Sequence, residues 1–504
     1  MTHNAFCLRN FILLSILLLL VTDYNTNLLS ATPATGSKDG GNLIWVKHAG
    51  GPGYDECSGI TTLSDNSTVV VGGFADSATF GEGETNQTVL TSTGSEDIFV
   101  ARYNPDGTLA WAKSAGGGKK DKGTEVVKLS DNSTVVIGFF QFSATFGPGE
   151  ANETILTSAG VYGSFIFISR YNPDGTLAWA KRVGGSVENE VGCGITALSD
   201  NSTVMIGLFN NSVTFGKGEV KQTTLTSRGM NDIFIARYDP DGTLAWAKRA
   251  GGSDSDSSKG IKTLSDNSLV VTGWFNSTAT FGPSEANETV LTSSGDEDIF
   301  IARYKSNGTL IWAKRSGGSN FDISKGITTL SDNSTVVVGS FNGSSIFGPG
   351  DTNQTVLISL SKSDTFIARY NPDGTLAWAK CLGGASDYWS SDITTLSDNS
   401  TVISGCFGGT ATFGPGEVNE TVLTATGAWD IFIARYNPDG SLVWVKRAGG
   451  LDYDQSNGIT TLSDDSTVVT GWYYTKSTFG PGESLQTVLT YFGDRDIFIA
   501  RFAP

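Results

Sequence analysis

The stretch DIFVARYNPDGTLAWAKSAGG, residues 97–117, decides the fold, because it recurs with small changes along most of the chain. Its tryptophan marks the repeat, and successive copies lie 66, 68, 67, 66, 66 and 66 residues apart. The seven tryptophans are Trp45, Trp111, Trp179, Trp246, Trp312, Trp378 and Trp444. A unit that recurs at a fixed spacing and cannot bury its own apolar faces must stack against its copies.

Each repeat predicts four short strands joined by tight turns. In the first unit, residues 59–63 and 67–74 form one hairpin, and residues 97–103 and 108–113 form a second hairpin across an Asn-Pro-Asp-Gly turn. The strands are nearly continuous apolar runs, as expected for sheets that are covered on both faces. The sequence therefore predicts an all-β protein, a seven-bladed β-propeller with four-stranded blades.

The two ends of the sequence predict how the ring closes. The last unit ends as DIFIARFAP, residues 496–504, without a tryptophan strand, whereas a lone tryptophan strand, residues 43–47, precedes the first complete unit. We expect this N-terminal strand to be the outer strand of the last blade, with residues 59–63 and their equivalents nearest the axis. The predicted propeller covers residues 41–504.

Residues 1–34 are typical of a secretory signal peptide and linker. Arg9 precedes an apolar run over residues 11–21, and small residues follow near residues 30–34. The run is shorter than the roughly 20 residues that cross a bilayer, so we expect no membrane insertion after the signal is removed. The predicted localisation is secreted or at the cell surface, and we expect a monomer.

Composition disfavours several classes of function. A formal net charge of −17 argues against nucleic-acid binding, which needs clustered Lys and Arg. The chain contains only two histidines, His3 and His48, so Ser-His-Asp and Cys-His catalysis is poorly supported. Carboxylate pairs could still support glycoside hydrolysis, and a carbohydrate-active enzyme that uses axial carboxylates is one alternative function.

Several recurring residues predict structure rather than chemistry, because one active site needs only one copy. Aspartate opens the third strand in six units, at Asp97, Asp232, Asp298, Asp364, Asp430 and Asp496, with Phe165 in the other unit. Arginine recurs in all seven, at Arg102, Arg170, Arg237, Arg303, Arg369, Arg435 and Arg501. These two series predict structural ion pairs. A glycine repeated in every second strand, as at Gly72 and Gly339, predicts close packing against an aromatic ring or backbone.

A further aspartate recurs ten residues after the tryptophan, where the outer strand leads to the next inner strand. The set is Asp55, Asp121, Asp256, Asp322 and Asp454, with Asn189 and Tyr388 at the same distance in the other units. Carboxylates that encircle an axis could bind a hard cation, and calcium is the cofactor that this pattern suggests. The alternative is that each aspartate caps its own turn.

Aromatic residues that break the repeat lie beside these aspartates, at Tyr54, Phe321, Tyr388, Trp389 and Tyr453. Departures from a symmetric repeat are where a binding site can be built, and aromatic faces beside carboxylates suit a glycan or a protein segment. We therefore hypothesise a non-enzymatic binding or scaffold propeller that presents its long loops to a glycan or an extracellular protein. A purely structural surface protein is a second alternative.

The repeat also resembles a known family. The unit W-A-K-x-x-G-G, G-I-x-x-L-S-D-N-S-T-V-V-x-G-x-F, T-F-G, T-V-L-T-S and D-I-F-I-A-R-Y is similar to the bacterial seven-bladed propeller repeat family known as SBBP, over residues 42–504. The resemblance implies a secreted or surface-exposed propeller. It implies little about activity, since function depends on sites added to the fold.

Overall fold

The computed structural model of this protein describes residues 40–158, 163–184, 191–382 and 388–504. The regular structure in these ranges is entirely β, and they contain no helix that could cross a membrane. The expected signal peptide and linker of residues 1–34 lie outside the described residues.

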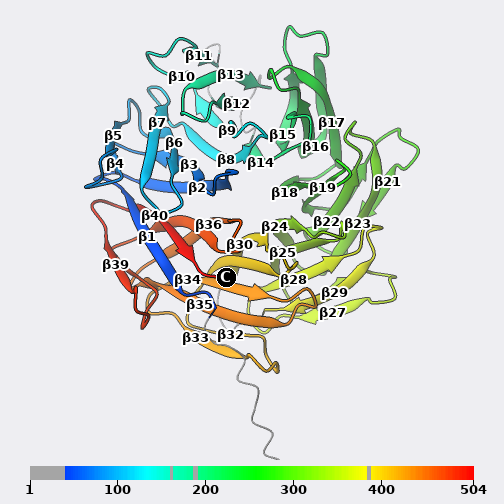
Figure 1. The fold of residues 1–504 in the computed structure, drawn as a ribbon. Coiled ribbons are helices and arrows are strands. Elements are labelled where there is room, and N and C mark those ends of the chain that lie inside the picture. Colours follow the sequence, from blue (N-terminus) through cyan, green and yellow to red (C-terminus); the bar gives the residue numbers. More distant parts are fainter. Residues whose placement is uncertain (1–39, 159–162, 185–190, 383–387) are drawn as a thin grey trace, which may run out of the picture. The chain divides into compact units, whose positions relative to one another are not determined.

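Seven four-stranded antiparallel sheets form the blades of a β-propeller, as expected (Figure 1). The inner strands are β2 (Asp55–Thr62), β8 (Lys122–Lys128), β14 (Val191–Ala197), β18 (Asp256–Thr263), β24 (Ile323–Thr329), β30 (Tyr388–Thr395) and β36 (Asp454–Thr461). The second strands are β3 (Thr68–Phe74), β9 (Thr134–Gln141), β15 (Thr203–Phe215), β19 (Leu269–Phe275), β25 (Thr335–Phe341), β31 (Thr401–Phe407) and β37 (Thr467–Tyr473).

The third and outer strands complete the blades, which we number 1 to 7 in the order of their inner strands. The third strands are β6 (Asp97–Tyr103), β12 (Ser164–Tyr171), β16 (Thr223–Tyr238), β22 (Asp298–Tyr304), β28 (Asp364–Tyr370), β34 (Asp430–Tyr436) and β40 (Asp496–Phe502). The outer strands, which carry the tryptophans, are β7 (Leu109–Ala115), β13 (Leu177–Val183), β17 (Leu244–Gly252), β23 (Leu310–Gly318), β29 (Leu376–Cys381), β35 (Leu442–Gly450) and, for blade 7, β1 (Leu43–Gly50).

The inner strands surround the axis, and each contacts the next around the ring (Figure 1). Strand β36 of blade 7 in turn contacts β2 of blade 1. In blade 7 the N-terminal strand β1 pairs with β40 from Leu43↔Phe502 to Ala49↔Ile497. The two ends of the described chain therefore share one sheet.

The blades hold together because both faces of each sheet are apolar and buried. All seven residues of β3, β25, β31 and β37 are buried. The apolar clusters span neighbouring blades, and Val70 of blade 1 packs in one cluster with Val468 and Ile497 of blade 7. Burial on both faces explains why these strands lack the polar-apolar alternation of a half-exposed sheet.

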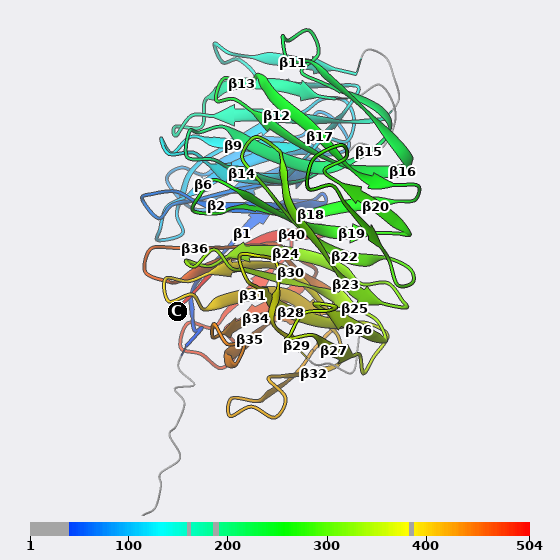
Figure 2. The ribbon, with the colours of Figure 1, turned by 90° about the vertical axis from the view of Figure 1, so that its right-hand side faces the viewer.

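Short hairpins extend the blades between the second and third strands. They are β4 (Ser77–Phe80) with β5 (Thr88–Thr91), β10 (Ser143–Phe146) with β11 (Thr154–Thr157), β20 (Thr278–Phe281) with β21 (Thr289–Thr292), β26 (Ser344–Phe347) with β27 (Thr355–Ile358), β32 (Thr410–Phe413) with β33 (Thr421–Thr424), and β38 (Lys476–Phe479) with β39 (Thr487–Thr490). Strands β4, β20, β26 and β38 pair with the outer strand of the preceding blade. Blade 3 instead continues β15 and β16 into one long hairpin, visible from the side in Figure 2.

The repeated tryptophan links each blade to the next. The Trp111 indole Nε1 donates a hydrogen bond to the Pro173 carbonyl, 3.2 Å away in the turn of blade 2, and Gly175 of that turn lies against the Trp111 ring. The same bond runs from Trp45, Trp179, Trp246, Trp312 and Trp378 to Pro105, Pro240, Ser306, Pro372 and Pro438. Blade 7 lacks this turn, and Trp444 packs instead against Gly40 and Gly41.

The seven arginines of the series form structural ion pairs, but with a different aspartate series from the one that we expected. Arg102 pairs with Asp65, in the turn between the first two strands, and also donates to the Pro173 carbonyl of blade 2. Each of the other blades has the same arginine-aspartate pair. The Asp97 series lies at the other end of the third strand, where Asp232, Asp298 and Asp430 pair with arginines of the outer strand.

The turns between the first and second strands form a closed circle of hydrogen bonds. The Ser64 amide of blade 1 donates to the Asn132 side chain of blade 2, and this bond recurs at each junction up to Ser463 of blade 7, which donates to Asn66 of blade 1. Asn66 and its equivalents have φ near +63°, a conformation that Asn and Asp tolerate better than most residues.

The repeated glycine of the second strand has the packing role that the sequence predicts. A Cβ on Gly339 would lie 2.1 Å from the Ile323 carbonyl oxygen and 2.7 Å from the Phe366 ring. We expect Gly339→Ala to lower the free energy of unfolding by about 3 kcal/mol, because backbone must shift to admit the methyl group. Chemical denaturation measures the loss. Gly118→Ala, where a Cβ would meet nothing within 4 Å, is the control, and equal effects of both substitutions would contradict the packing argument.

The pairing of β1 with β40 also predicts a strong effect of truncation. Deletion of residues 42–48 removes five of the six paired positions between β1 and β40 and leaves most of β40 with an open edge. We expect the melting temperature to fall by more than about 10 °C, since several kcal/mol of burial and pairing are lost. A protein that begins at Gly40 serves as the control. An unchanged melting temperature in the shorter protein would show that the ring does not depend on β1.

Candidate binding face

The long connections that the structure describes lie on one face of the propeller, which we call the long-loop face. It carries loops that join an outer strand to the next inner strand, such as residues 51–54, and the ends of the hairpins around residues 75–76 and 92–96. The tight turns that contain Asn66 and Gly107 join strands at their other ends. Long loops on a rigid scaffold are the usual place for binding residues, so the candidate sites are described from this face.

The five predicted metal-binding aspartates lie at the entry to the inner strands and are fully buried. Each carboxylate accepts hydrogen bonds from its own loop. Asp256 accepts from the Gly252 amide at 2.7 Å and from the Asn276 amide at 3.3 Å, and Asp55, Asp121, Asp322 and Asp454 accept from the equivalent Gly51, Gly117, Gly318 and Gly450. The structure thus gives each aspartate the turn-capping role that the sequence left open as the alternative to calcium.

The structure does not gather these aspartates into one cation site. Within the described ranges, no three His, Cys, Asp or Glu side chains come together as metal ligands. Asn189 lies outside the described residues. Each aspartate instead lies near one member of the Asp97 series in the preceding blade. Oxygens of Asp55 and Asp496 both lie within 3.1 Å of the point where a Cβ on Gly50 would be.

Burial makes these aspartates difficult to ionise. It raises the pKa of Asp55 and Asp256 to about 8 and that of Asp121, Asp322 and Asp454 to about 7, and the neighbouring aspartate of the preceding blade contributes to the rise. The turn aspartates behave in the opposite way. Hydrogen bonds from Thr108 hold the pKa of Asp106 below its usual range.

Tyr54 belongs to a cation-π cluster at the junction of blades 7 and 1. The Arg495 guanidinium lies 3.6 Å from the Tyr54 ring centroid and 4.2 Å from that of Trp472. Arg495 also pairs with Glu56, 2.9 Å away, and Glu56 accepts a hydrogen bond from the Tyr54 hydroxyl at 3.0 Å. Burial lowers the pKa of Arg495 only to about 10, so the side chain stays charged at neutral pH. The cluster fixes two loops from opposite ends of the sequence.

Tyr453 lies in a second group of aromatic residues that adjoins this cluster. Its ring meets Trp429 edge to face, with centroids 5.1 Å apart, and its carbonyl accepts the Tyr474 amide. Tyr491 lies beside Tyr474, since its amide donates to the Thr475 carbonyl, and Phe492 follows it. Tyr453 is 43% exposed, Tyr491 45% and Phe492 59%. We call the set Trp429, Tyr453, Tyr474, Tyr491 and Phe492 the aromatic patch.

The other predicted aromatic residues are not brought into this patch. Phe321 is 41% exposed on the loop between blades 4 and 5. Tyr388 and Trp389 begin strand β30, and their side chains lie outside what the structure describes. The sequence pattern did not single out Arg495, Tyr474 or Phe492. The signal that could have found them was the departure from the repeat at Trp472 and Trp429, which are two of the four tryptophans outside the seven repeated positions.

A polar cavity runs along the axis of the propeller. Every inner strand contains a β-bulge at the same place, and the bulged residue of every blade lines the cavity: Ser58, Thr124, Cys193, Lys259, Lys325, Ser391 and Asn457. A bulge redirects one side chain without disturbing the rest of the strand. The cavity has a volume of about 300 Å³, and a second volume of about 310 Å³, lined also by Glu56 and Gln455, adjoins it.

Two carboxylic acids lie next to the bulges in the axial cavity. Glu125 of blade 2 and Asp392 of blade 6 stand where the other five blades have glycine. Burial, reinforced by the charge of Asp392, raises the pKa of Glu125 to about 8, whereas Lys262 acts against that rise. Burial also raises the pKa of Asp392. The sequence analysis placed the Asp55 series around the axis and did not single out Glu125 or Asp392, which are the acids that line the axial cavity.

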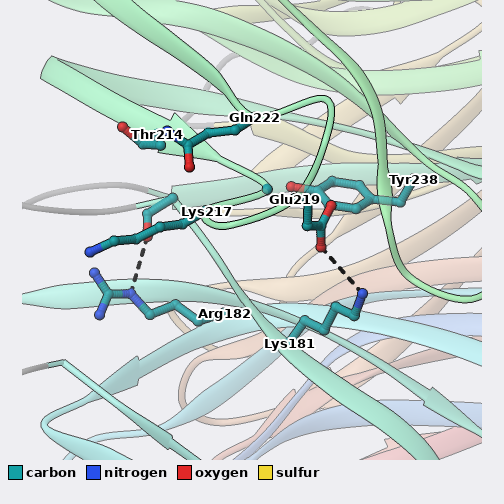
Figure 3. A pocket seen from close by; sticks show the side chains of 9 residues that line it. Lys181, Arg182, Thr214, Lys217, Glu219, Gln222 and Tyr238 are labelled. Atoms are coloured by element: carbon teal, nitrogen blue, oxygen red, sulfur yellow. Dashed lines mark hydrogen bonds and ion pairs between the residues drawn. The ribbon is translucent and has the colours of Figure 1, made fainter.

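A further pocket of about 460 Å³ lies on the rim, between blades 2 and 3 (Figure 3). It opens beside the long hairpin of β15 and β16, and its walls include Lys181, Arg182, Lys217 and Glu219. Lys181 pairs with Glu219 at 3.3 Å, which repeats the pairs Lys113–Glu150 and Lys248–Glu285 of neighbouring junctions. The pocket is thus built largely from a contact that joins blades.

Comparison with known proteins agrees with this architecture. A family model described as a domain of unknown function (DUF5122) beta-propeller matches residues 89–109. That family is a β-propeller family. An uncharacterized WD repeat-containing protein, L264, of Acanthamoeba polyphaga mimivirus is 22% identical over 530 residues. The match covers 90% of this chain but 37% of the viral protein, so the chain spans little more than a third of that relative.

Solved structures give only distant likenesses. A protein of unknown function from Bacteroides caccae is 11% identical, with a TM-score of 0.32 over 61% of this chain and 79% of its own. The gluconolactonase XC5397 from Xanthomonas campestris is 10% identical, with a TM-score of 0.30 over 74% and 90%. BBS1N in complex with ARL6DN is 10% identical, with a TM-score of 0.37 over 92% and 97%.

The raised pKa values of the buried aspartates predict how stability depends on pH. Between about pH 4 and pH 8 the folded protein holds protons that the unfolded chain has released, so the free energy of unfolding falls as pH rises. We expect Asp256→Asn to reduce this fall by on the order of 1–3 kcal/mol. Melting temperatures from pH 5 to pH 8.5 measure the slope. Asp106→Asn is the control, and an unchanged slope in Asp256→Asn would contradict the prediction.

Proposed function

We propose that this protein is a secreted or cell-surface, non-enzymatic binding propeller that presents its long-loop face to a glycan or a protein. The observation that carries the proposal is the aromatic patch on blades 6 and 7. Exposed aromatic rings gathered on one face commonly mark interaction sites. Apart from Phe321, the large apolar residues that are exposed elsewhere in the described ranges are aliphatic or Met, as are Val89, Ile155 and Val290 on the hairpins.

The surroundings of the patch support a role in binding. Arg495, clamped between Tyr54 and Trp472 and paired with Glu56, holds the loops of blades 7 and 1 in place. A surface that is rigid before binding loses less conformational entropy when a ligand attaches. Asp452 and Asp494 lie within the same loops and offer acceptors beside the rings. Rings that can cover the apolar face of a sugar, with acceptors for its hydroxyl groups, favour a glycan.

Secretion is part of this proposal and rests on the sequence. The signal-like residues 1–34 and the resemblance of the repeat to the SBBP family both favour a protein outside the cell. An acidic chain with a net charge of −17 also suits a soluble extracellular protein.

A second candidate function is a carbohydrate-active enzyme that uses the axial acids. Glu125, whose raised pKa keeps a proton available near neutral pH, could act as a proton donor, and Asp392 would be the second carboxyl group of the pair. Release of reducing ends from polysaccharides, abolished by Glu125→Gln, would favour this alternative. Absence of turnover across a broad polysaccharide panel would favour the binding protein.

The binding proposal predicts that the aromatic patch determines glycan affinity. We expect the purified propeller to retain members of a glycan array, and Tyr453→Ala with Phe492→Ala to weaken that binding at least about tenfold, since two exposed ring contacts are lost. Ile155→Ala, which removes a 61% exposed side chain from a hairpin, is the matched control. If the Tyr453→Ala and Phe492→Ala variant binds glycans as well as the Ile155→Ala variant does, the aromatic patch is not the binding site. If the propeller captures a protein and no glycan, the ligand is not a glycan.

A further inference from the structure

Three lysines line the axial cavity, Lys259, Lys262 and Lys325. Lys259 of β18 and Lys325 of β24 are the bulged residues of neighbouring blades, whereas the charge of Lys262 acts on the two acids and opposes the rise in the pKa of Glu125 and of Asp392. Burial lowers the pKa of Lys325, and the charge of Lys259 adds to this effect. The other bulged residues carry no positive charge. The cavity therefore has a concentrated positive charge on the side of blades 4 and 5.

Neither bulged lysine is neutralised by an ion pair, although the chain as a whole is strongly acidic. In the described part of the chain, Lys47, Lys113, Lys248 and Lys380 each pair with a glutamate, whereas Lys259 and Lys325 form no ion pair. Partly buried ammonium groups without a counterion are costly, and such groups are found where a ligand supplies the opposite charge.

The acids closest to the cavity are already engaged or carry a proton. Glu56, at the end of the cavity near the long-loop face, pairs with both Lys122 and Arg495. The pKa of Glu125, about 8, leaves that group mostly neutral below pH 8. Asp392 accepts hydrogen bonds from the Ile393 and Ile459 amides. None of these acids replaces a counterion for the lysine pair.

Polar groups suited to an oxyanion surround the lysines. Ser58, Ser391 and Asn457 line both adjoining volumes together with Lys325. Hydroxyl and amide donors beside two ammonium groups are the usual means of holding a carboxylate, sulfate or phosphate. The volume of about 310 Å³ on the side of Glu56 has room for a single sugar or an ion of that size.

We infer that the axial cavity is an anion-binding site in which Lys259 and Lys325 hold an oxyanion, either a free inorganic anion or the acidic group of a sugar. The site lies on the axis and does not depend on the aromatic patch for its chemistry. The anion site therefore goes beyond the proposed function, and the two proposals can be tested independently.

The test is a calorimetric titration of the propeller at low ionic strength with inorganic sulfate, with glucuronate and with uncharged glucose. We expect at least one anion to bind and glucose not to bind. The double substitution Lys259→Ser and Lys325→Ser should weaken anion binding by about tenfold or more. Serine is the natural residue at this bulge in blades 1 and 6, so this variant should fold, and its melting temperature checks that it does. Lys259→Arg with Lys325→Arg should retain binding.

Two controls separate the site from general charge effects and from the aromatic patch. Lys305→Gln removes an exposed charge from a tight turn on the other face and should leave anion binding unchanged. Tyr453→Ala with Phe492→Ala should also leave it unchanged, even if glycan binding is lost. Tighter binding of glucuronate than of sulfate would identify an acidic sugar, and sulfate binding alone would identify a free inorganic anion. Failure of both anions to bind at millimolar concentration, or equal binding by the double serine variant, would overturn the inference.

Discussion

Burial between neighbouring blades is the constraint on which the rest of this structure depends. A single four-stranded blade is apolar on both faces, so it is stable only between two others. Except in blade 6, where Trp444 packs against Gly40 and Gly41, the indole of the outer strand contributes a directional contact to this packing, because it bonds to a carbonyl in the turn of the next blade. At the junction of blades 7 and 1, the Trp45 indole donates to the Pro105 carbonyl, and the Ser463 amide donates to the Asn66 side chain. This junction is therefore held by the same two kinds of hydrogen bond as the others.

This dependence explains why most repeated polar residues serve the fold. Arg102 and its equivalents tie the end of the third strand to the first turn of their own blade, and Arg102 also reaches the next blade. The Asp55 series caps the loops that lead into the inner strands. A repeated carboxylate in such a loop looks like a cation ligand in the sequence. In the structure its oxygens already accept hydrogen bonds from backbone amides of the loop, and burial raises its pKa, which favours the protonated form. The carboxyl group therefore does not need a cation.

The number of blades, their four strands and the tight turns could be predicted because each depends on local pattern and on the spacing of the repeat. The ion-pair partner of Arg102 could not be predicted. Arg102 and Asp97 lie at opposite ends of the third strand, and the repeat pattern does not show which aspartate series lies beside the arginine. The stacking of Arg495 on Tyr54 was also beyond the sequence, because these residues lie at opposite ends of the chain and meet only where blade 7 adjoins blade 1. The axial lysines were missed because nothing in the sequence marks the β-bulge that turns them toward the axis.

The bulge shows how a symmetric scaffold can acquire an asymmetric site. Most strand positions pack against two neighbouring blades, so a charged residue there would be buried among apolar side chains. The bulged residue faces the axial cavity instead, and Ser58, Cys193, Lys259 and Asn457 occupy this one position in different blades with the same backbone pairing. The glycine position beside it also varies, since Glu125 and Asp392 occupy it in blades 2 and 6. Chemistry in this fold is therefore confined to the axis and to the loop tips, where a substitution in one blade does not disturb the packing of the others.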